Sequence, residues 1–178
     1  MANFSEFLPQ LLRFEGGYVD DPADPGGATN KGITMQTFVD RAPAILGIEP
    51  TPQAFRALTD QQAGTIYKNS YWDLVGGDWV TLQPLADMVC DFYVNAGANA
   101  VRTLQQVLNA KGVVPALTVD GVFGPATLRW LLSVDQADVY RRLKQGRIDY
   151  YRGLVERDPA LGKFLDGWLN RVNAFPDL

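Results

Sequence analysis

The sequence contains no histidine and only one cysteine, Cys90. Without histidine, neither a Ser/His/Asp triad nor a Cys/His pair can form, so hydrolysis through nucleophiles of those types is excluded. Histidine and cysteine also supply most zinc ligands, so we expect no zinc site and predict no cofactor. A single cysteine cannot form an internal disulfide, and the apolar neighbours of Cys90 indicate a buried thiol rather than a reactive one.

Long apolar runs are missing as well. No segment approaches the roughly 20 apolar residues of a membrane-spanning helix, so membrane insertion is not predicted. The first residues lack a basic stretch followed by an apolar one, and we therefore expect no secretory signal peptide. The acidic pI of about 4.8 and the lack of a recognition motif argue against nucleic acid as a partner.

The composition is otherwise that of a globular protein, and the charge is unevenly distributed. The chain has 178 residues, of which 47% are hydrophobic and 20% charged, enough for a sizeable core. Residues 1–95 hold 5 basic and 12 acidic side chains, whereas residues 96–178 hold 11 basic and 8 acidic ones. The basic excess gathers on a helix predicted near residues 136–156. These basic residues indicate either that the helix is attracted to an anionic surface or, more simply, that one face of the helix is solvated.

The chemically most informative stretch runs from Phe14 to Thr34. Apolar residues recur at helical spacing from Phe4 to Leu12, and Glu15 falls on the same helix face. Burial disfavours the charged form of a carboxyl group, and a protonated carboxyl group can act as a general acid. Gly16 and the next glycine then end the helix. A structural ion pair is the alternative role for Glu15.

A second carboxylate favours the catalytic alternative. Asp24 lies in an acidic loop nine positions after Glu15, and Thr29 and Thr34 follow it. Cleavage of a glycosidic bond needs one protonated carboxyl group and a second, ionised one. A hairpin that returns over the helix end would hold the two groups on opposite sides of a sugar ring, with Thr29 or Thr34 positioning water.

The remaining pattern predicts a mainly α protein with seven or eight helices and one small β-hairpin. Thr59 and Gln62 form a capping box at the start of a helix that carries Tyr71 and Trp72 near its end. These aromatic residues are interpreted either as core or as platforms for sugar rings. Asn95, at the end of a helix expected to be buried at residues 84–96, is either a helix stop or a substrate ligand. The other predicted helices cover residues 36–41, 99–110, a segment from 125, 136–156 and 160–173, and the predicted strands cover residues 18–19 and 32–34.

The stretch around Glu15 resembles the signature of the glycoside hydrolase family 108 lysozymes. The resemblance rests on two motifs, Glu15-Gly16-Gly17-Tyr18 and Asp24-Pro25-Gly26-Gly27-x-Thr29-Asn30-x-Gly32-Ile33-Thr34. It continues through Tyr67-x-x-x-Tyr71-Trp72 and Asp91-Phe92-x-Val94-Asn95-x-Gly97. Two later segments, Val119–Leu128 and Gly167–Val172, resemble the family's C-terminal peptidoglycan-binding-type region, so the resemblance covers nearly the whole chain.

The resemblance implies a lysozyme-like helical body with one small β-hairpin flanking the active-site cleft. It implies a catalytic region at residues 1–96 and a helical peptidoglycan-binding-type region at residues 97–178, packed as one compact body. The implied reaction is that of an N-acetylmuramidase, which hydrolyses the β-1,4 bond between N-acetylmuramic acid and N-acetylglucosamine in bacterial peptidoglycan glycan strands. Glu15 is then the essential acid and a monomer is expected. Residues expected to contact substrate are Tyr18, Asn30, Thr34, Tyr71, Trp72 and Asn95.

Such enzymes serve in host cell lysis, as phage endolysins, or in bacterial wall remodelling and secretion. We therefore expect a protein made in the cytoplasm that acts on the cell wall, in the periplasm, after holin-type release or dedicated export. The chain departs from related patterns in two places. The step from Asp24 to Thr29 is one residue shorter than in classical tailed-phage lysozymes, and Lys31 stands where an aromatic residue is expected. A lytic transglycosylase that uses Glu15 alone and a non-catalytic peptidoglycan-binding protein are the two alternatives.

Overall fold

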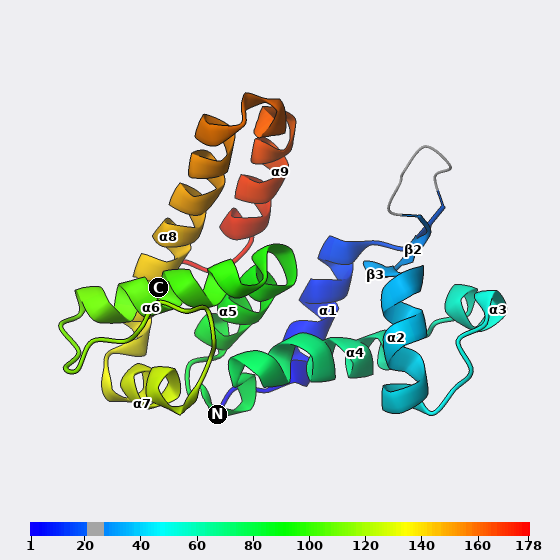
Figure 1. Ribbon diagram of the computed structural model, residues 1–178, viewed down its shortest axis with the longest axis horizontal. Helices are drawn as coiled ribbons and strands as arrows, with labels where there is room; N and C mark the ends of the chain where they lie inside the picture. The colour runs from blue at the N-terminus through cyan, green and yellow to red at the C-terminus, as the bar shows by residue number, and fades with distance from the viewer. Residues whose placement is uncertain (21–26) are drawn as a thin grey trace. The chain divides into compact units, whose positions relative to one another are not determined.

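The computed structural model describes residues 1–20 and 27–178, and within them the chain is mainly α-helical (Figure 1). The predicted fold class is therefore confirmed. The α-helices are α1 (Phe4–Glu15), α2 (Met35–Leu46), α3 (Pro52–Arg56), α4 (Asp60–Tyr67), α5 (Gln83–Ala96), α6 (Ala98–Ala110), α7 (Pro125–Ser133), α8 (Gln136–Arg157) and α9 (Gly162–Asn173). The strands are β1 (Tyr18–Val19), β2 (Thr29–Asn30) and β3 (Ile33–Thr34). Short turns η1 (Lys68–Trp72), η2 (Asp73–Val75), η3 (Gly77–Trp79) and η4 (Pro159–Leu161) complete the described elements.

The chain divides into two compact units. The first unit is Phe4–Asp73, and the second combines Met1–Asn3 with Leu74–Leu178. This division follows packing, in which α5 contacts α6 and α8 and so joins the second unit. The predicted division between residues 96 and 97 concerns function, and it stays a prediction.

The first unit is built around α1, whose buried face carries Phe4, Phe7 and Leu11. The ring of Trp72 packs against this face, with its centroid 5.4 Å from that of Phe4 and 6.2 Å from that of Phe7. The Trp72 side chain is fully buried. These contacts pack α1, the helix that ends at Glu15, against η1, the turn that follows α4.

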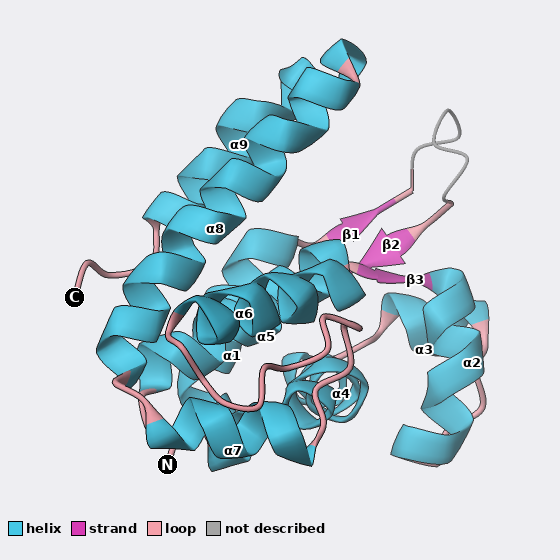
Figure 2. Cartoon of the chain, turned by 60° about the vertical axis from the view of Figure 1, so that its left-hand side comes forward, coloured by secondary structure: helices cyan, strands magenta, loops and turns pink. Residues whose placement is uncertain are grey.

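The sheet has three antiparallel strands in the order β1-β2-β3, drawn side by side in Figure 2. Tyr18 pairs with Asn30, and Asn30 pairs with Ile33. The connection between β2 and β3 is Lys31-Gly32, with φ values of 51° and 75°. Two positive φ values are typical of the tight type I′ hairpin turn. The predicted strands at residues 18–19 and 32–34 are thus joined by an additional strand that the sequence pattern missed.

In the second unit, α5 is the buried central helix, as predicted, and a charged cluster fixes it to α8 and α9. Asp91 on α5 is fully buried, and its carboxylate lies 2.7 Å from Nη2 of Arg147 and 2.7 Å from Nη2 of Arg171. Arg147 is itself fully buried, with its guanidinium 5.1 Å from the ring centroid of Phe92. The prediction of a solvated basic face along α8 is therefore wrong at Arg147, whose charge is neutralised inside the unit.

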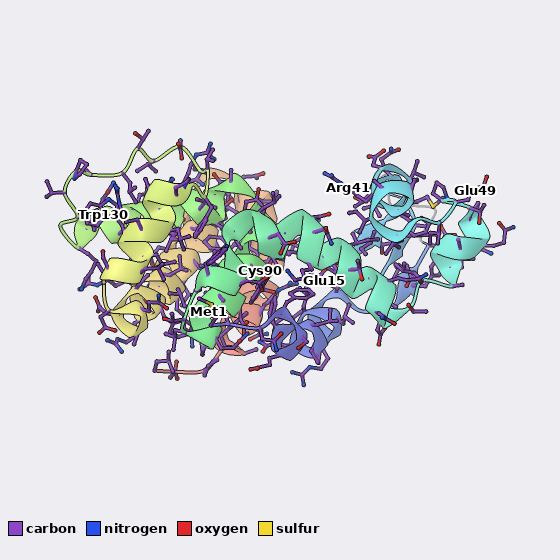
Figure 3. The ribbon with its side chains drawn as sticks, turned by 90° about the horizontal axis from the view of Figure 1, so that it is seen from below. Met1, Glu15, Arg41, Glu49, Cys90 and Trp130 are labelled. Carbon is purple, nitrogen blue, oxygen red and sulfur yellow. The ribbon has the colours of Figure 1, made fainter. Side chains whose placement is uncertain are left out.

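Three local predictions can be compared directly with the described elements. The thiol of Cys90, labelled in Figure 3, is buried, as predicted. Helix α2 continues to Leu46, past its predicted end at Arg41, with Pro43 inside it. A segment predicted as loop forms the short helix α3. Among the helices of the described part of the chain, none combines the length and the apolar character that crossing a membrane requires.

Candidate active site

Glu15 is the last residue of α1, and the chain turns away directly after it. Gly16 has a φ of 75°, a conformation that glycine adopts without strain, and its N–H donates to the carbonyl of Leu12 at 3.1 Å. Glu15 is half-buried. The helix therefore ends in a residue, labelled in Figure 3, that is only partly accessible.

The turn between β2 and β3 lies directly against this carboxyl group. A Cβ atom built on Gly32 would collide with Oε2 of Glu15 and would lie 2.7 Å from its Cβ. The same Cβ would lie 2.6 Å from the hydroxyl oxygen of Tyr67. Only a residue without a side chain fits here, so the backbone of Gly32 and the Tyr67 hydroxyl together limit where the Glu15 side chain can go.

Two further contacts hold the turn in place. The Tyr67 hydroxyl donates to the carbonyl of Lys31 at 2.9 Å, and the Lys31 N–H donates to the carbonyl of Gly17 at 3.3 Å. The Lys31 ammonium pairs with Asp60 at 2.6 Å. Lys31, which replaces the expected aromatic residue, thus links the turn to α4. A cavity of about 490 Å³ beside it is lined by Pro9, Leu12, Arg13, Gly16, Lys31 and Asp60.

Tyr18 is partly exposed on β1, where a substrate can reach it. Its hydroxyl donates to Oδ2 of Asp20 at 3.0 Å and accepts a hydrogen bond from Nε of Arg56 at 3.3 Å. The hydrogen bond from Arg56 to Tyr18 raises the pKa of the Arg56 guanidinium, which also lies 5.7 Å from the centre of the ring. Sequence analysis missed Arg56 because its partners are 36 or more positions away and no local motif marks it.

The threonines and the asparagine of the signature take mainly structural positions. Asn30 is buried, and its amide donates to the carbonyl of Phe55 at 2.7 Å. Thr34 is the N-cap of α2, where its hydroxyl accepts a hydrogen bond from the Thr37 N–H at 3.1 Å. Thr29 is half-buried and pairs with Val19 and Thr34 across the sheet. The Asn30 amide nitrogen is thus used by the backbone, and contact of this residue with a sugar stays a prediction.

The predicted aromatic ligands differ in accessibility. Trp72 is fully buried between the rings of Phe4 and Phe7, so the prediction that it stacks on substrate is wrong. Tyr71 is half-buried, and its ring centroid is 5.5 Å from that of Tyr67. Of the two, Tyr71 alone presents surface to a ligand.

The remaining predicted residues are Asn95 and Asp24. Asn95 is exposed in the second unit, where its Oδ1 accepts hydrogen bonds from Arg147 at 3.0 Å and Tyr151 at 3.2 Å. Asp24 lies outside the described residues. The described part of the chain therefore brings together Glu15, Lys31, Gly32 and Tyr67 around one carboxyl group, an arrangement that suits proton donation to a bound ligand.

Comparisons with known proteins define the class. Residues 8–97 match the family described as "Glycosyl hydrolase 108", and residues 99–173 match one described as "Predicted Peptidoglycan domain". A solved structure titled "Structure of Brucella abortus SagA" is 31% identical, with a TM-score of 0.67, and the match covers 97% of this chain and 94% of that one. No curated protein matches.

These matches show a glycoside hydrolase whose second region is of a type associated with peptidoglycan. The chain belongs to the glycosyl hydrolase 108 family, and together the two regions make it a peptidoglycan hydrolase. The cluster around Glu15 lies within the part of the chain that matches the hydrolase family.

Proposed function

We propose that the protein is an N-acetylmuramidase that cleaves the β-1,4 bond between N-acetylmuramic acid and N-acetylglucosamine, with Glu15 as general acid. The observation that carries this proposal is the contact of the Glu15 carboxyl group with Gly32, beside the Tyr67 hydroxyl. A general acid must deliver its proton to one oxygen atom, and catalysis falls steeply when such a group is displaced by about 1 Å. A turn that restricts the carboxyl group in this way meets that requirement.

The proposed mechanism uses two further residues of the signature. Asp24 supplies the ionised carboxylate that stabilises the oxocarbenium-like transition state or orients water. Thr29, which is half-buried on β2, positions that water. Tyr18 and Tyr71 contact the glycan from partly accessible positions.

We also propose that residues 1–96 carry catalysis and that residues 97–178 hold the wall. The hydrolase family match ends at residue 97, and the peptidoglycan match begins at residue 99, which supports this division. Helix α5 precedes the boundary but packs with α6 and α8, so the catalytic region ends on a helix that needs the wall-binding region for burial. The proposed biological role is host cell lysis or wall remodelling.

The chemistry of the products tests the proposal. Purified peptidoglycan sacculi are digested with the protein, and the soluble fragments are separated and weighed by mass spectrometry before and after borohydride reduction. The proposal predicts fragments that end in a reducible N-acetylmuramic acid.

Two other results would refute it. Reducible N-acetylglucosamine ends would mean that the neighbouring glycosidic bond is cut. Anhydro-muramic ends, which are lighter by one water and resist reduction, would identify a lytic transglycosylase, in which no water attacks the sugar.

A further inference from the structure

The second unit contains a groove between α6 and α8. Its volume is about 500 Å³, and its lining includes Val107, Ala110, Arg142, Gln145, Asp149 and Tyr150. All of these residues fall within the segment that matches the peptidoglycan domain. Helices α6 and α8 pack directly against each other, and the two helices appear together in Figures 1 and 2.

The floor of the groove includes apolar side chains of α6, and Gly146 allows α8 to pack closely against that helix. A Cβ atom on Gly146 would lie 2.9 Å from the Thr103 methyl group, which shows how closely the two helices approach. Val107 is half-buried and Ala110 is exposed beside it. This floor offers an apolar surface that methyl groups can contact.

The rim carries one charge of each sign. Arg142 is half exposed, with a side-chain exposure of 53%, and its Nε donates to Asp138 at 2.9 Å. Asp149 accepts a hydrogen bond from Nε2 of Gln145 at 2.8 Å. The two charged residues are seven positions apart on α8, which places them about 10 Å apart along the helix axis.

We propose that this groove binds the stem peptide of peptidoglycan. A stem peptide combines alanine methyl groups with free carboxylates and, where its third residue is a diamino acid, a free amine. The methyl groups match the floor, a carboxylate matches Arg142, and the amine matches Asp149. The peptide-substituted glycan strand also has methyl groups but lacks these charges, because its sugars are uncharged and the muramic carboxyl group is used in the amide bond to the peptide.

The inference rests on peptidoglycan as the substrate, yet its test does not depend on hydrolysis. The probe is a free stem tetrapeptide of L-Ala, D-Glu, a diamino acid and D-Ala, which has no glycosidic bond. Titration calorimetry of the full-length protein with this peptide is expected to show saturable binding. Replacing one partly exposed charged partner is expected to weaken binding about fivefold, the change that a loss of about 1 kcal/mol produces. We expect this for Arg142→Ala and for Asp149→Asn.

Matched controls lie on the same helix. Arg141 also faces Asp138, at 3.8 Å, and is similarly exposed at 48%, but it does not line the groove. Arg141→Ala and Glu156→Gln should therefore bind the peptide as wild type does. Circular dichroism establishes that each variant is folded.

Three outcomes would overturn the proposal: no saturable binding, equal weakening by Arg141→Ala and Arg142→Ala, or full displacement of the tetrapeptide by a peptide-free disaccharide. If the protein binds the tetrapeptide but releases no muramic ends from sacculi, the proposed peptide site is supported and the proposed muramidase reaction is refuted.

Discussion

Replacing Gly32 by alanine tests whether the turn positions the Glu15 carboxyl group. The substitution adds one methyl group, which would collide with Oε2 of Glu15 and lie 2.6 Å from the Tyr67 hydroxyl. The colliding carboxyl group can rotate away, but the Glu15 Cβ, 2.7 Å from the added carbon, requires a small shift of the turn. We therefore expect a folded protein in which the acid is displaced.

The change has two separable costs. A φ of 75° in a residue with a Cβ costs about 1–2 kcal/mol of folding free energy. Displacing a catalytic group by about 1 Å lowers the rate about 100-fold, which corresponds to about 2.7 kcal/mol in the activation free energy. Gly47→Ala is the matched control, because Gly47 has a φ of 66° but nothing within 4 Å of its Cβ position.

The assay measures kcat and KM on solubilised peptidoglycan together with the free energy of unfolding in urea. Both variants should lose stability through the positive φ, and Gly32→Ala should lose more because of its close contacts, whereas only Gly32→Ala should lose about 100-fold in kcat. If the two variants have the same kcat, the contact with Gly32 does not position Glu15, and the reasoning about the site is wrong.

Three further predictions concern stability. Asn30→Ala should lower the free energy of unfolding by about 1–3 kcal/mol and leave KM unchanged, since the amide satisfies buried backbone carbonyls; a raised KM at unchanged stability would indicate that Asn30 contacts substrate. Asp91→Ala should lower the free energy of unfolding in urea by about 3–5 kcal/mol, because two arginines lose their buried partner. Asp166→Ala, at an exposed position on α9, should leave it almost unchanged. Equally small effects of the two substitutions would contradict the role of the charged cluster. Lys111, and after it Arg142, lower the pKa of Asp138 from 3.8 to about 2, so this carboxylate stabilises the fold above pH 4 and its contribution is lost as the pH falls towards 2. Asp138→Asn should therefore show a weaker loss of stability across that range in acid titrations followed by circular dichroism, and an unchanged acid transition would refute the assignment.

Local signals in the sequence predicted local structure well. The capping box of Thr59 and Gln62 is present in full, because both partners lie within one helical turn. The glycine after Glu15 ends α1 as predicted. The buried character of α5 also followed from its apolar residues, six of which are buried together with Asp91.

Trp72 shows a case in which helical spacing did not decide between a core position and a platform for sugar rings. The chain widens into a π-helical turn at Lys68–Trp72, which adds a residue to the turn and rotates the side chains that follow. Periodicity of 3.6 residues does not anticipate this change. The sequence therefore identified a pair of aromatic residues without showing that Trp72 points into the core.

Long-range partners account for most of what the sequence could not predict. The predicted end of α2 at Arg41 rested on Pro43, which cannot donate a hydrogen bond to the carbonyl of Val39. The helix nevertheless continues to Leu46. Val39 is 39% exposed, whereas Ala42 is fully buried. Arg147 looked like one of several solvated basic residues because its partner, Asp91, is 56 positions away. The contact of Gly32 with Glu15 likewise depends on a return of the chain that no short motif encodes.

The most direct test of the central claim compares Glu15→Gln with Glu6→Gln on purified sacculi. Glu6 is exposed in the first turn of the same helix, so its substitution controls for the loss of one negative charge on α1. Removing a general acid should lower kcat by about 10²–10⁴-fold, with folding and wall binding retained, whereas Glu6→Gln should match wild type. Release of muramic ends by Glu15→Gln at a rate close to that of wild type would show that Glu15 is a structural residue and that another group supplies the proton.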